Sequence, residues 1–172
     1  MVRKLNGCGT SDASIYRQRL GEFFLGDRYR FETAWVVPTT EAQKKLLALL
    51  QDSSRMTAMH IKPSSVVSYA WATSYQQSSQ WARETLAAAM DDNIRTREQA
   101  HAWLKYKNYQ PSVLKISALT RLSGRMASAN IAFDDHPNEK RFADQIETIT
   151  VDSMFTWMVG VNLGAAPVML RL

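Results

Sequence analysis

The spacing of apolar residues changes along the chain, and this change constrains the fold more than any other feature. Over residues 64–90, apolar side chains recur every three or four positions, which is the period of one helical face. From residue 112 onward they alternate, over 112–122, 127–133 and 148–161, which is the period of a half-buried strand. We therefore predict an α+β fold, with helices mainly N-terminal and central, packed on a curved antiparallel sheet formed largely by the C-terminal third.

Patterns typical of helix N-termini predict further helices. Thr40 and Thr96 each open a capping box that ends in Gln three positions later, so we predict helices over 40–51 and from 96 to Pro111. The other predicted elements are a short helix over 14–24 and strands over 28–37 and 55–62. Helices followed by a curved antiparallel sheet is an order similar to that of cone-shaped folds of the nuclear-transport-factor kind, which include periplasmic subunits of bacterial conjugation machines.

The length of 172 residues fits one domain. We predict a flexible basic lead over residues 1–12, which are rich in Gly, Ser, Thr and Asn, and a single domain over 13–172. Because Cys8 is the only cysteine, no intrachain disulfide and no zinc site of several thiolates is possible, and no cofactor is expected. No window approaches the ~20 apolar residues that span a bilayer. The lipoprotein-like box Leu5–Cys8 has too few residues before it for a signal peptide, so we expect a soluble chain.

The strongest candidate for chemistry is a group of carboxylates around an imidazole: Asp134, Asp135, His136 and Glu139. Such groups can hold a divalent cation or act as general acid and base. The alternative is a polar turn whose side chains bond the local backbone. We favour the turn, because a metal site would need further ligands from elsewhere. The sequence also lacks a Gly-rich phosphate loop and the known hydrolase motifs, so we assign no catalytic residue and no metal ligand and predict that the protein is not an enzyme.

One segment has a pattern typical of nucleic-acid binding. The net charge of the chain is +5, and residues 95–109 interleave cations with aromatic side chains, which together neutralise phosphates and stack bases. The residues concerned are Arg95, Arg97, Trp103, Lys105, Tyr106 and Lys107. The competing interpretation is a capped helix that buries Trp103 and leaves its cations in water. Nucleic-acid binding is therefore our alternative function.

The composition favours a protein that associates with other protein chains. Five Trp, six Tyr, six Phe and eight Met provide adaptable apolar contacts of the kind enriched at interfaces. The predicted strand over 148–161 has two faces to cover, and its second face carries Met154 and Met158. We predict an interface that includes these two residues with Trp157 and Tyr75. The first functional hypothesis is a structural subunit that forms homo-oligomers or docks in a larger assembly, such as a phage or virus particle or a secretion or conjugation machine.

Overall fold

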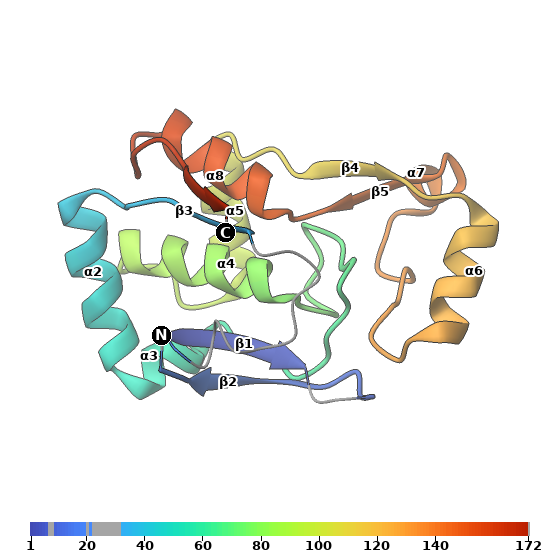
Figure 1. Cartoon of the computed structure of the whole chain (residues 1–172), viewed down its shortest axis with the longest axis horizontal. Coiled ribbons are helices and arrows are strands. Elements are labelled where there is room, and N and C mark those ends of the chain that lie inside the picture. The colour runs from blue at the N-terminus through green and yellow to red at the C-terminus, as the bar shows by residue number, and fades with distance from the viewer. Residues whose placement is uncertain (7–8, 20, 22–31, 172) are drawn as a thin grey trace.

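The computed structural model describes residues 1–6, 9–19, 21 and 32–171, and it confirms the predicted α+β class (Figure 1). The described elements in chain order are β1 (Val2–Asn6), β2 (Ala13–Arg17), β3 (Glu32–Trp35), α2 (Thr40–Gln51), α3 (Ser53–Ala58), α4 (Ser78–Met90), α5 (Arg97–Tyr106), β4 (Ser112–Lys115), α6 (Ala118–Ala127), α7 (Asn138–Phe142), β5 (Gln145–Thr148), α8 (Val151–Gly160) and β6 (Val168–Arg171). None of the helices in these ranges is long and apolar enough to cross a membrane.

The strands of the described part form three separate antiparallel pairs, β1 with β2, β3 with β6, and β4 with β5. The pair β3–β6 joins segments far apart in sequence, with Trp35 opposite Val168. The pair β4–β5 brings Ser112 opposite Thr148. Because the strands form three separate short ribbons, the prediction of one curved antiparallel sheet in the C-terminal third is wrong. The similarity to cone-shaped folds depended on that sheet and is therefore not supported.

Helix α4 occupies the centre of the molecule. Figure 1 shows it between the β1–β2 ribbon and α8, and it packs against α2, α5, β1 and α8. Its side chains are buried along most of its length, from Gln80 to Ala89, with Ala82 half-buried. Two of the buried residues are charged: Arg83 and Glu84 have no exposed surface. An ionised group in an apolar interior is costly unless it is paired, so the partners of these two residues shape the surrounding structure.

The alternating segment at the end of the chain is a helix and not a strand. Thr150 caps α8, because its side chain accepts a hydrogen bond from the Ser153 amide while the Ser153 hydroxyl accepts one from the Thr150 amide. Apolar residues in this segment satisfy both periods, since Met154, Trp157 and Met158 also fit a helical stripe. The capping box decides between the two periods, and the predicted strand over 148–161 is wrong beyond Thr148.

The strands predicted over 112–122 and 127–133 are also corrected. The first ends at Lys115, and Ser117 then caps α6 by accepting a hydrogen bond from the Thr120 amide. Ser123 and Gly124, which lie between the two predicted strands, are inside this helix. β4 pairs with β5 instead of pairing with 127–133.

The described elements before residue 62 agree with the predicted helix over 40–51 and differ from two other predictions. The helix over 40–51 is present as α2, although Thr39 and not Thr40 is its cap. The predicted strand over 55–62 is wrong, because Asp52 caps helix α3 there. The predicted helix over 14–24 begins inside strand β2, and its positions 20 and 22–24 lie outside the described residues.

Strand β3 lies within the strand predicted over 28–37, of which residues 28–31 are outside the described residues. Residues 7 and 8 of the lipoprotein-like box are also outside them. Residues 1–12, predicted as a flexible lead, contain strand β1, which places the side chain of Lys4 in the interior. The helix predicted over 64–90 begins only at Ser78, whereas the capping box of α5 at Thr96 and Gln99 forms as predicted.

Candidate functional site

Helix α6 projects at one end of the molecule and is attached to it by polar contacts (Figure 1). Arg121 is the buried residue of this helix, and its guanidinium donates to the carboxylate of Asp144 at 2.7 Å and to the carbonyl oxygen of Ile116. Gly124, on the same side, faces the Ile131 side chain, and a Cβ atom at this position would lie 3.6 Å from it. The inner side of α6 therefore consists of one cation and one residue without a side chain.

The opposite side of α6 is apolar and exposed. Leu119, Leu122 and Met126 are 77%, 58% and 82% exposed. Their spacing of three and four positions places them on one side of the helix, which we call the outer α6 face. A surface helix normally turns its apolar stripe towards the core, and this helix does the reverse. Large exposed apolar patches are uncommon on monomeric proteins and are typical of interaction sites.

A buried charge cluster holds the central helices together. The Glu84 carboxylate accepts hydrogen bonds from Arg97 Nε at 2.9 Å and Gln76 Nε2 at 2.6 Å, and it lies 2.6 Å from His101 Nε2. Burial by itself would raise the pKa of Glu84, but the hydrogen bonds from His101 and Arg97 outweigh it and hold this pKa below its usual range. Each carboxylate oxygen has two partners, so the cluster is closed and structural.

The charge cluster extends to the N-terminal strand through Lys4. Its ammonium donates to Gln76 Oε1 at 2.7 Å and to the carbonyl oxygen of Ile61 at 2.8 Å. Burial is the main cause that lowers the pKa of Lys4 to about 7, and the nearby Arg97 lowers it further. Strand β1 is thereby fixed to the loop that precedes α4.

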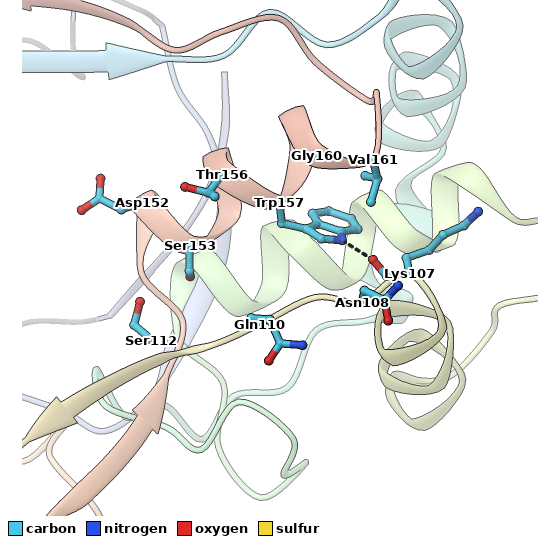
Figure 2. A pocket seen from close by; sticks show the side chains of 10 residues that line it. All are labelled: Lys107, Asn108, Gln110, Ser112, Asp152, Ser153, Thr156, Trp157, Gly160 and Val161. Atoms are coloured by element: carbon cyan, nitrogen blue, oxygen red, sulfur yellow. Dashed lines mark hydrogen bonds between the residues drawn. The ribbon is translucent and has the colours of Figure 1, made fainter.

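A cavity of about 570 Å³ lies between α8 and the segment that follows α5. Figure 2 shows Trp157 in its middle, with the indole Nε1 donating to the Lys107 carbonyl oxygen at 2.9 Å. Ser153 and Gln110 contribute neutral polar groups, and Lys107 and Asp152 contribute one charge of each sign. The lining therefore has no excess of charge and no nucleophile paired with a base.

The chain matches a protein family over most of its length. A family model described as "Uncharacterized protein conserved in bacteria (DUF2145)" matches residues 1–158. The chain belongs to the DUF2145 family. The match runs from β1 into α8, so the part of this DUF2145 protein that it covers includes α6 and the buried charge cluster. No curated protein and no solved structure matches the chain.

The four residues predicted as an interface do not form one surface in this DUF2145 protein. Trp157 and Met158 lie in the hydrophobic core, and Met154 packs against that core while half-buried. Tyr75 is half-buried elsewhere, with its hydroxyl 3.1 Å from an Asp134 carboxylate oxygen. The outer α6 face was missed because its segment was assigned to a strand. The signal that could have found it is the spacing of Leu119, Leu122 and Met126 together with the Ser117 cap.

The residues predicted to contact nucleic acid separate into a buried and an exposed group. Arg97 is buried against Glu84, and the Trp103 ring packs edge-on against Trp157 with 6.1 Å between ring centroids. The exposed group consists of Arg95, Lys105 and Tyr106, with the half-buried Lys107 holding its ammonium 5.4 Å from the Tyr106 ring. Only the exposed group is available to a phosphate backbone.

The carboxylate and histidine group at 134–139 links two loops. Asp135 accepts a hydrogen bond from the Tyr69 amide at 2.8 Å, and its other oxygen lies 2.9 Å from His136 Nδ1. The side chains of Asp135 and His136 are fully buried, whereas Glu139 is exposed on α7. Within the described ranges no group of three or more potential ligands is arranged to hold a metal ion. The pair therefore fixes the loop around residue 69 against the loop that precedes α7.

Proposed function

We propose that this DUF2145 protein is a non-enzymatic interaction subunit that associates with a second copy of itself through the outer α6 face. The observation that carries the proposal is the reversed orientation of α6, which is attached by Arg121 and exposes Leu119, Leu122 and Met126. Burying a large apolar side chain contributes roughly 1.5–3 kcal/mol. Three such side chains on one helical face favour a partner that covers them.

The arrangement of the outer α6 face suits a copy of the same helix. Leu119 and Met126 flank Leu122 at nearly equal distances along the helix, so two antiparallel copies related by a two-fold axis near Leu122 align all three residues. In this pairing each Leu119 meets the Met126 of the partner. Arg125 then lies opposite Thr120 of the partner, so the two arginines do not face each other. The interface is smaller than the ~800 Å² per partner of a standard one, and we expect a dissociation constant of about 10 μM or weaker.

The oligomeric state of matched variants tests this proposal. We expect light scattering behind a sizing column to show a dimer at high protein concentration, and Leu122→Glu to convert it to a monomer, because a carboxylate would be buried at the two-fold axis. Leu47→Glu is the control, since Leu47 on α2 is also 58% exposed. A wild-type protein that stays monomeric at every concentration, or an equal effect of both variants, contradicts the proposal.

Nucleic-acid binding is the second candidate, favoured by one observation. Tyr106 is exposed at the end of α5 between Lys105 and Lys107, and an exposed ring between two cations is an arrangement that stacks a base and neutralises phosphates. Absorbance recorded at 260 and 280 nm across the same sizing-column peak tests it. A 260 nm excess that disappears at high salt supports this function, and its absence at low salt counts against it.

A further inference from the structure

A second cavity, of about 430 Å³, lies where the loop before α4 meets α5, α7 and β5. Its walls combine three aromatic rings with three charged side chains: Tyr69, Trp71, Tyr109, Lys105, Lys140 and Glu147. The volume lies within the range typical of small-molecule sites, and polar atoms make up more of its exposed lining than apolar atoms do. We call it the Trp71 cavity. It is separate from the outer α6 face.

Positive charge exceeds negative charge around the Trp71 cavity. The Lys140 ammonium lies 2.5 Å from a Glu147 carboxylate oxygen, so these two charges neutralise each other. Lys105 is exposed on α5, with its ammonium 4.9 Å from the centre of the Trp71 ring. No carboxylate within the described ranges forms an ion pair with Lys105. Among the described residues, Lys105 is therefore a cation at the rim of the cavity that no carboxylate neutralises.

A further cation lies behind the aromatic wall. The Arg83 guanidinium is completely buried, 4.5 Å from the centre of the Tyr109 ring and 5.1 Å from that of Trp71. Its Nη2 donates to the Ala70 carbonyl oxygen, but Nε and Nη1 have no hydrogen-bond partner among the described residues. Within the described ranges no carboxylate forms an ion pair with Arg83, and the nearby Glu84 attracts it without direct contact. The remaining field of this cation in a low-dielectric region favours an anion in the adjacent space.

We propose that the Trp71 cavity binds a small organic anion, a phosphate or carboxylate group attached to a ring. Lys105 provides the charged contact for the anionic group, with Arg83 adding attraction from behind the wall. The rings of Tyr69 and Trp71 provide apolar surface for the body of the ligand, and the cavity is larger than a single phosphate needs. This site does not depend on association through α6.

Titration calorimetry with defined probes tests the site on the full chain. We expect phenyl phosphate or benzoate to bind with one-to-one stoichiometry, and the tighter of the two identifies the anionic group. Lys105→Gln should weaken that binding by about tenfold, a loss typical of one charge-assisted contact. Lys105 is exposed, so the variant is expected to fold. The control is Lys44→Gln, which removes an exposed lysine of α2 and should leave the affinity unchanged.

Three results would overturn the site. The first is no saturable binding of either probe up to about 10 mM, well above the weakest affinity of a specific small-ligand site. The second is an equal loss of affinity in Lys105→Gln and Lys44→Gln. The third is inorganic phosphate binding as tightly as phenyl phosphate, since the aromatic walls would then contribute nothing. Binding of a single-stranded oligonucleotide without binding of either probe would assign Lys105 to nucleic acid instead.

Discussion

Replacing Glu84 by alanine is expected to lower the free energy of unfolding by about 3–5 kcal/mol, because it leaves partners of a buried ion pair without their counter-charge. Arg97 and His101 would remain in the interior, and the Gln76 amide would lose one of its two acceptors, keeping the Met59 carbonyl oxygen. Urea unfolding followed by circular dichroism measures the change. The matched control is Glu41→Ala, which removes an exposed carboxylate paired with Lys45 and should cost less than about 1 kcal/mol.

The pH dependence of stability gives the Glu84 prediction a second readout. The pKa of Glu84 is lower in the folded protein than in the unfolded chain, so the unfolded chain binds more protons in the window between the two values. The stabilisation is present above the unfolded pKa and is lost as the pH falls through the folded one. Glu84→Gln should remove this part of the acid dependence. A Glu84 variant that unfolds at the same urea concentration as Glu41→Ala, with an unchanged pH profile, contradicts the account of the cluster.

Met158→Asp is expected to destabilise the fold severely, by about 4 kcal/mol or more, because it places an unpaired carboxylate in the core. Met158 is 4% exposed, whereas the neighbouring Val159 is 38% exposed. Val159→Asp should therefore cost less than about 1 kcal/mol. A strand would give the opposite result, since the alternation would place Val159 inside and Met158 outside.

The two variants at 158 and 159 thus test the helical structure of α8 directly. Thermal unfolding of both proteins, followed by circular dichroism, is sufficient. A stable Met158→Asp protein together with an unfolded Val159→Asp protein would show that the segment is a strand, and it would restore Met158 as an interface residue.

The elements that the sequence predicted correctly are those with local signals. α5 was predicted because Thr96 and Gln99 form its capping box within four positions, and α2 because of the capping-box pattern at Thr40, one position after the Thr39 that caps the helix. α8 and α6 were assigned to strands because their apolar residues fit both periods. In α8 the capping box of Thr150 and Ser153 selects the helical period. These two residues are close in the sequence, so their capping pattern could have predicted this helix.

The candidate sites depend on contacts that sequence spacing does not reveal. Lys4 and Gln76 lie 72 positions apart, and Arg121 and Asp144 lie 23 positions apart. The ion pair of Arg121 decides which side of α6 faces the protein, and therefore which side is exposed. Arg97 was predicted to contact phosphate because its partner Glu84 lies in a different helix, and the spacing of residues within 95–109 does not show this pairing. In each case the tertiary partner, and not the residue itself, determines the role.

The most direct test of the central claim is a disulfide between two copies of α6. A single cysteine replaces Leu122 in a Cys8→Ser background, so that the introduced thiol is the only one in the chain. Near the two-fold axis of an antiparallel helix pair, two such residues come within the ~4.4–6.8 Å between Cα atoms that a disulfide requires. Mild oxidation is expected to give a covalent dimer for Leu122→Cys and little for Leu47→Cys on α2. Equal yields from the two positions would contradict association through the outer α6 face.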